Sequence, residues 1–287
     1  MAFEWTHIYI ILTLHLSTIK IECPMPEKNP YQASDNNLTE GRKRPGVELA
    51  VTGIKSLPAI SGLDWIKDAF KLFKMNPLIW IILVVLWLVL NIVVQFVPIV
   101  GGLAMALLYA VFMAGFMIGC AALERGERLE IGHLFAGFKS NNTGALIGLG
   151  AINLLLIILL SVIGSVLLMF SEADLAAFTN PESINQVADL SSRVLTAVYV
   201  VLLLLIPVIM MFWFAPVLIS LGGVPLIESL KMSFLGCFKN TLPFLIFSIA
   251  MLILAIIASI PFFLGWLVLM PMGMAAFYTA YRAIYTD

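Results

Sequence analysis

Glu130 and His133 have the residue types and the spacing that come closest to a chemical site in this sequence. An E-x-x-H pair places a carboxylate and an imidazole on one helix face, as in the di-metal sites of helical bundles. Such sites need a second pair and further carboxylates, and this sequence contains a single copy. We therefore interpret Glu130 and His133 as part of a solvated polar helix face.

The other residues that commonly carry catalysis do not form a recognisable constellation. Hydrolysis by a serine needs a neighbouring base, and no His accompanies the serines of the apolar segments. The metalloprotease motif H-E-x-x-H is absent from the sequence. Cys23, Cys120 and Cys237 are scattered, without the spacing of a disulfide framework or a metal site. We predict that the chain is not an enzyme and that it holds no metal or cofactor.

Five residues within the apolar segments are candidates for a polar pathway or for contacts between helices: Asn91, Gln95, Asn153, Pro207 and Pro216. Asn91 and Gln95 are four residues apart and so share a helix face. Prolines interrupt helices, and broken helices form substrate sites in transporters. Intramembrane amides also join helices through hydrogen bonds worth about 0.6–2 kcal/mol. The sequence favours contacts between helices and leaves a polar pathway as the alternative.

The elements that would position these residues are membrane spans. Hydrophobic residues make up 61% of the chain and charged residues 11%, whereas a soluble protein carries roughly 25% charged residues. Uncharged apolar stretches of at least ~18 residues predict transmembrane helices. The expected fold class is all-α, a polytopic membrane protein with six spans near 77–97, 102–122, 144–170, 195–222, 243–260 and 266–284.

The lysines and arginines predict the orientation of these spans. One side of the membrane receives Arg42, Lys43, Arg44, Lys55, Lys67, Lys71, Lys74, Arg125, Arg128, Lys139, Lys231, Lys239 and Arg282. The other side has Arg193 alone, in a predicted loop over 171–193. By the positive-inside rule, we expect both termini in the cytoplasm. The lipid bilayer is then the expected partner. Protein partners and self-association stay open, and three basic residues at 42–44 are too few to predict nucleic-acid binding.

Residues 1–24 and 25–60 differ in character from the spans. The apolar run at 5–19 is too short to cross a bilayer, and no Lys or Arg precedes it as in a signal peptide. We expect 1–24 to be an upstream extension, with Met25 as the natural start, or else a short apolar anchor. Residues 25–60 are polar and irregular, which predicts a flexible cytoplasmic leader before a six-helix transmembrane domain at 61–287.

Three of the spans are preceded by a Phe-Lys pair: Phe73 and Lys74, Phe138 and Lys139, and Phe238 and Lys239. Hydrophobic residues upstream of each pair recur at spacings of three and four, which places them on one helix face. This pattern is typical of an amphipathic helix at the membrane interface, with Phe and Lys as interfacial anchors. The sequence therefore predicts three repeats, each an interfacial helix followed by a hairpin of two spans.

Longer strings around these pairs carry a resemblance to known proteins. They read GLDWIKDAFKLFKMNPLIW, FMAGFMIGCAALERGERLEIGHLFAGFK and FAPVLISLGGVPLIESLKMSFLGCFKNTLPF. With them the chain resembles, over about 55–285, an uncharacterised family of six-span proteobacterial inner-membrane proteins. That family has no assigned activity, so the resemblance implies a fold and a location and no reaction.

These observations lead to two hypotheses about function. We expect a non-enzymatic inner-membrane protein that acts through protein or lipid partners, because three interfacial helices accompany spans that contain no ionisable residue. The alternative is a transporter or channel for a small or weakly polar solute, motivated by the amides and prolines within the spans.

Overall fold

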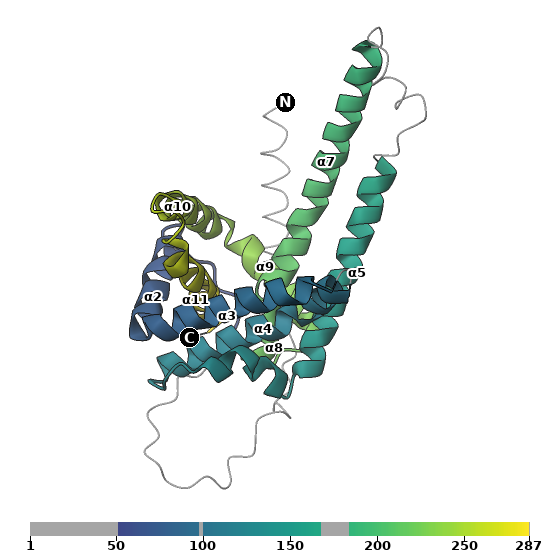
Figure 1. Cartoon of the computed structure of the whole chain (residues 1–287). Coiled ribbons are helices and arrows are strands. Elements are labelled where there is room, and N and C mark those ends of the chain that lie inside the picture. The colour runs from purple at the N-terminus through teal and green to yellow at the C-terminus, as the bar shows by residue number, and fades with distance from the viewer. Residues whose placement is uncertain (1–50, 98–99, 168–183, 287) are drawn as a thin grey trace. The chain divides into compact units, whose positions relative to one another are not determined.

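The described residues of this computed structural model, 51–97, 100–167 and 184–286, are almost entirely helical and contain no strand. They belong to one compact unit, Lys43–Asp287. In chain order the helices (Figure 1) are α2 (Ser61–Met75), α3 (Pro77–Gln95), α4 (Val100–Glu124), η1 (Ile131–Lys139), α5 (Thr143–Leu167), α7 (Ile184–Trp213), α8 (Ala215–Ser220), α9 (Leu226–Lys239), α10 (Thr241–Ser259) and α11 (Trp266–Tyr285).

The six predicted membrane spans are confirmed. The segments long and apolar enough to cross a bilayer are Pro77–Gln95, Val100–Glu124, Thr143–Leu167, Val194–Ser220, Thr241–Ser259 and Trp266–Tyr285. The predicted bounds lie within two residues of these, apart from 168–170, which fall outside the described residues. The agreement follows from the uniform apolarity of these stretches and from prolines near helix starts, such as Pro77 at the beginning of α3.

The helix that carries the fourth span begins earlier than the predicted span and is interrupted before the span ends. This helix, α7, begins at Ile184, inside the predicted loop over 171–193, and ends at Trp213. After a break at Phe214 the short helix α8 completes the span. Pro216, in the first turn of α8, has no N–H to continue the helical ladder. Pro207, by contrast, lies within the unbroken α7.

The predicted repetition is present in the order of the elements. The first repeat contains α2, α3 and α4; the second contains η1, α5 and α7 with α8; the third contains α9, α10 and α11. The short helix of the second repeat is a 3-10 helix. Its Gly137 lies so close to α4 that an added Cβ would be 2.1 Å from the carbonyl oxygen of Val111. The backbones of η1 and α4 therefore pack directly against each other at Gly137.

The repeats pack in a cyclic order. Each short helix contacts both long helices of the preceding repeat: η1 packs on α3 and α4, α9 on α5 and α7, and α2 on α10 and α11. In the last case the first repeat follows the third. One face of each short helix therefore packs against other helices of the domain. The buried face of α2 contains Trp65, Ala69 and Leu72, whereas Phe70 is exposed.

Residues 51–57 link the third repeat to the first through hydrogen bonds, since no loop of the chain connects these two repeats. Loops 125–130 and 221–225 link the first repeat to the second and the second to the third. Between the third and the first, the backbone N–H groups of Thr52 and Lys55 donate to the carbonyls of Tyr285 and Ile284, both at 2.9 Å. Residues 51–57, which were expected to belong to a flexible leader over 25–60, are instead held by hydrogen bonds to α11 and Asn240, and residues 25–50 lie outside the described residues.

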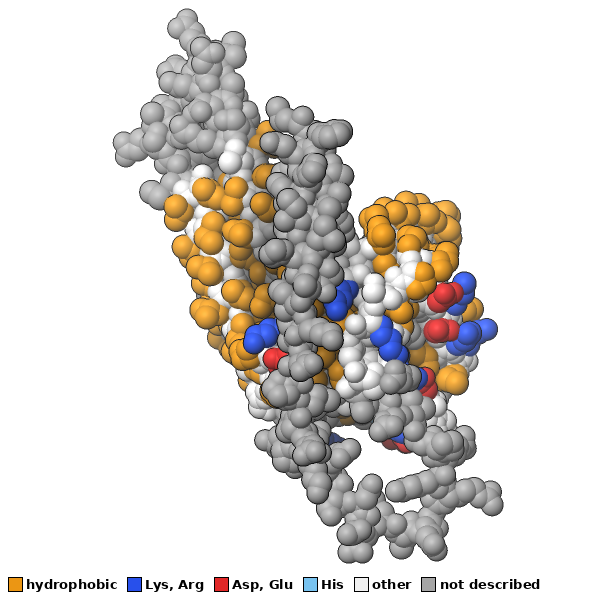
Figure 2. Space-filling view, turned by 180° about the vertical axis from the view of Figure 1, so that it is seen from behind, with side chains coloured by type: hydrophobic (Ala, Val, Ile, Leu, Met, Phe, Trp, Pro, Cys, Tyr) orange, Lys and Arg blue, Asp and Glu red, His pale blue; other side chains and the backbone are white. Residues whose placement is uncertain are grey.

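The core lies where the second long helix of each repeat ends. The buried stretches are the second half of α4, α8 apart from its last residue, and about half of α11. Elsewhere the long helices expose large hydrophobic side chains, which suits contact with lipid. In Figure 2 hydrophobic side chains cover broad areas, and charged side chains appear at a few places toward the middle of the view.

Candidate functional site

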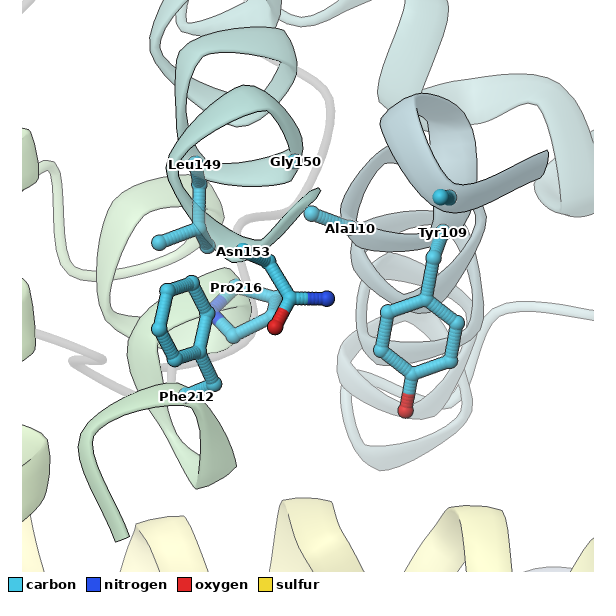
Figure 3. Close-up of a pocket in the computed structure, with 8 residues that line it drawn as sticks. Tyr109, Ala110, Leu149, Gly150, Asn153, Phe212 and Pro216 are labelled. Atoms are coloured by element: carbon cyan, nitrogen blue, oxygen red, sulfur yellow. The ribbon is translucent and has the colours of Figure 1, made fainter. Parts of the chain in front are cut away.

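A small cavity lies where the first and second repeats meet, beside the break in the fourth span. Its volume is about 20 Å³, and its walls come from α4, α5, α7 and α8 (Figure 3). The lining residues are Ala106, Tyr109, Ala110, Leu149, Gly150, Asn153, Phe212 and Pro216. Two of the predicted polar-pathway residues, Asn153 and Pro216, are therefore brought together here.

Close packing of α4 and α5 positions Asn153. Gly150 lies against α4, and an added Cβ would be 2.1 Å from the carbonyl oxygen of Leu107. Asn153 is three residues further along α5, on the same face. Its amide lies between the Pro216 ring and Tyr109 (Figure 3), and it forms no hydrogen bond with a described residue.

The break in the fourth span forms the other wall of the cavity. In a continuous helix the N–H of Phe214 would donate to the carbonyl of Met210. Here it donates to the hydroxyl of Ser233 at 2.8 Å, and that hydroxyl donates to the Met210 carbonyl at 2.7 Å. A side chain inserted into the helical ladder is an established cause of a sharp bend. Ser233 belongs to α9, so the short helix of the third repeat satisfies the break.

The remaining pathway candidates lie apart from this cavity. Asn91 donates from its amide nitrogen to the Trp87 carbonyl of its own helix at 2.7 Å. Gln95 is exposed at the last residue of α3, and Pro207 is inside α7. None of these three lines the cavity. The five candidates therefore do not form one path among the described residues.

The three Phe-Lys pairs share a place at the end of a short helix, but their phenylalanines differ. Phe73 is 6% exposed and belongs to the core, Phe138 is 39% exposed, and Phe238 is half-buried. The lysines Lys74, Lys139 and Lys239 are all exposed, and none forms an ion pair with a described residue. The ammonium of Lys74 lies 5.0 Å from the centre of the Phe70 ring.

Glu130 and His133 have a structural role that their spacing did not reveal. The backbone N–H of Glu130 donates to Nδ1 of His133 at 2.9 Å, and the Glu130 side chain accepts from the N–H of His133. This reciprocal arrangement is a capping box at the start of η1. The pair thus stabilises the end of a helix.

A polar cluster that the sequence analysis missed joins the first and third repeats. Glu124, in the last turn of α4, forms an ion pair with Arg282 of α11. The hydroxyl of Tyr278 donates to the same carboxylate. These residues are 154 or more positions apart in the chain. The only signal in the sequence was a charged residue near the end of the second span in the first and third repeats, Glu124 and Arg282. Such a position does not identify the partner of either residue.

Comparison with known proteins gives a location. No family model matches the chain, and no solved structure matches it. A curated protein of Burkholderia thailandensis, named as a probable inner membrane protein, is 27% identical over 209 residues, which cover 69% of this chain and 74% of that protein. Together with the six apolar helices, this similarity identifies the chain as a multi-pass inner-membrane protein.

Proposed function

We propose that this protein is non-enzymatic and acts in the inner membrane through lipid or protein partners, with both termini in the cytoplasm. Its short helices would then face the headgroups of the cytoplasmic leaflet. The supporting observation is the exposed lysine at the end of each short helix, Lys74, Lys139 and Lys239, without a carboxylate partner among the described residues.

The chemistry of these lysines favours anionic lipid as the first partner to test. A lysine near a membrane extends its ammonium to the level of the phosphates while its stem stays in apolar surroundings. Each basic residue near an anionic surface contributes about 1 kcal/mol of attraction. The cyclic packing gives each repeat one such lysine at the same place, the end of its short helix.

Native mass spectrometry can test this proposal with matched variants. The protein is extracted from bilayers that contain phosphatidylglycerol and phosphatidylethanolamine, and retained lipids are counted. We expect the triple variant Lys74→Gln, Lys139→Gln, Lys239→Gln to retain less phosphatidylglycerol than the wild type.

The control is a second triple variant with the same change in net charge. Lys67 and Lys71 form ion pairs with Asp64 and Asp68 at 2.8 and 2.7 Å, and Lys231 lies 3.9 Å from Glu228. Changing these three paired lysines to Gln should affect lipid retention less. Equal losses in both variants would contradict a role for the unpaired lysines.

The orientation is tested separately by labelling single cysteines from either side of the membrane. A cysteine at Lys139 should react with an impermeant maleimide only from the cytoplasmic side, and a cysteine in the 171–193 segment only from the opposite side. Reaction of both from one side would refute the proposed topology.

A second candidate function, passage of a small or weakly polar solute, is favoured by the meeting of Asn153 and Pro216 at a broken helix. Solute flux into liposomes should then fall in Asn153→Leu and remain in Asn91→Leu, because Asn91 is already bonded within its own helix. No flux by the wild type across a panel of small neutral solutes would remove this candidate.

A further inference from the structure

We propose that the surface around Tyr109 and Asn153, within the membrane, binds a second copy of this chain, with the phenol and the amide of each copy hydrogen-bonded to those of the other. Tyr109 belongs to α4 and Asn153 to α5, so the surface lies where the first and second repeats meet. This inference does not depend on the proposed function, because it concerns polar groups in the middle of the spans and not the lysines of the short helices.

Both polar side chains lie near the middle of their spans. Tyr109 is the tenth of 25 residues in α4, and Asn153 is the eleventh of 25 in α5. At about 1.5 Å per residue, each lies roughly 15 Å from the start of its helix, in a hydrocarbon layer about 30 Å thick. The polar groups of lipids lie near the ends of the spans. At the level of Tyr109 and Asn153, the surrounding acyl chains offer no donor or acceptor.

Neither group has a partner in the part of the chain that the structure describes. The Tyr109 hydroxyl and the Asn153 amide form no hydrogen bond with a described residue. Tyr109 is 42% exposed, Asn153 is half-buried, and both line the partly open cavity of Figure 3. An unsatisfied polar group in the hydrocarbon region costs several kcal/mol. The two groups therefore favour association with another protein inside the membrane.

The chemistry of the two groups matches a second copy of the same surface. A carboxamide and a phenol can each donate and accept a hydrogen bond. In a dimer with two-fold symmetry the same surface meets itself, so Tyr109 of one copy faces Asn153 of the other, and the reverse contact forms as well. Two copies therefore satisfy all of these groups without any further polar residue.

The face of α4 beside Tyr109 permits a close approach. Gly102 and Ala106 precede Tyr109 at spacings of four and three, which places them on the same side of the helix. An added Cβ at Gly102 would meet no atom within 4 Å, so this part of α4 is open to the membrane. Small side chains let membrane helices pack closely, and hydrogen bonds between the helices then add to the packing.

Counting photobleaching steps of single fluorescent molecules in liposomes tests this surface, because it gives the fraction of dimers at each protein density. We expect the wild type to dimerise as its density in the bilayer rises. Tyr109→Phe and Asn153→Leu should each raise the dimer dissociation constant about tenfold or more, because each removes hydrogen bonds from both copies. A wild type that stays monomeric at every density would overturn the proposal.

Two matched variants serve as controls. Tyr199 is 66% exposed on α7 and lies outside the cavity, and the Asn91 amide is bonded to Trp87 in its own helix. Tyr199→Phe and Asn91→Leu should therefore dimerise like the wild type. Tyr109→Phe keeps the ring and removes only the hydroxyl, so it decides the outcome even if Asn153→Leu does not fold. Unchanged dimerisation of Tyr109→Phe, or equal weakening in the controls, would overturn the assignment of this surface.

Discussion

Ser233 shows how one hydroxyl can allow a membrane helix to break. A broken helix leaves a donor and an acceptor without partners, and lipid offers neither. The Ser233 hydroxyl accepts from Phe214 and donates to Met210, so it replaces one missing hydrogen bond with two. The side chain is fully buried, which makes this replacement inaccessible to solvent. The break is thus a satisfied feature of the fold.

We expect Ser233→Ala to destabilise the protein by about 1–3 kcal/mol, because it leaves buried backbone groups unpaired. The measurement is thermal unfolding in detergent. Ser229→Ala is the matched control: Ser229 is equally buried on α9, but its hydroxyl bonds only to the Leu226 carbonyl of its own helix. Similar losses in both variants would show that burial, and not the inserted bond, matters at Ser233.

The loop after α4 contains a pair whose contribution depends on pH. Arg125 donates to Glu127 at 2.7 Å, and this hydrogen bond lowers the pKa of Glu127 below its ordinary value. A lowered carboxyl pKa adds stability above the ordinary pKa, and that stability is lost as pH falls through the lowered pKa.

We therefore expect Arg125→Gln to be slightly less stable than the wild type at neutral pH, by less than about 1 kcal/mol for so exposed a pair. The difference should vanish in acid, once Glu127 is protonated. Unfolding temperatures measured across acidic pH for both proteins test this. A difference that persists at the lowest pH would mean that Arg125 acts through other contacts.

Among the elements, the spans were predictable and the details of their ends were not. Hydropathy is a local property, so 77–97 or 243–260 could be placed closely from the sequence alone. Each of Pro207 and Pro216 predicts an interruption of the helix around it, yet only Pro216 lies next to an observed break in the fourth span. The difference depends on Ser233, which reaches the span from another repeat, and the sequence cannot report such a contact.

The 3-10 helix η1 provides a test of close backbone packing. We expect Gly137→Ala to lower stability by about 1–3 kcal/mol, because the new methyl group collides with the backbone of α4 at Val111. Gly132→Ala, in the same helix, meets no atom within 4 Å and should be tolerated. Thermal unfolding of the two variants side by side is the measurement. Equal tolerance would mean that α4 and η1 can move apart freely.

At the scale of the whole molecule, residues 51–57 form a non-covalent joint between the third repeat and the first, whereas loops of the chain link the other repeats. Asn240 holds this joint from the third repeat. Its amide oxygen accepts from Leu57, and its nitrogen donates to the carbonyls of Lys55 and Gly236, each at 2.9 Å. The sequence does not reveal this role of Asn240, because Leu57 and Lys55 are 183 and 185 residues away in the chain.

We expect Asn240→Ala to release residues 51–57 from the domain. Amide hydrogen exchange at Thr52, Lys55 and Leu57 should accelerate, because their N–H groups bond to α11 and to Asn240. Thr241→Ala is the control, since the Thr241 hydroxyl bonds only to carbonyls of α9. Unchanged exchange in Asn240→Ala would assign the joint to α11 alone.

The unequal lengths of the hairpins have a consequence for the surrounding lipid. The helix α5 has 25 residues, whereas α3 and α10 have 19 each. At about 1.5 Å per residue, α5 is roughly 9 Å longer. A bilayer of even thickness matches only one of these lengths with upright helices. The helix α5 and the equally long α4 must lean, or the acyl chains beside them must stretch, so hydrophobic mismatch is built into the first and second hairpins.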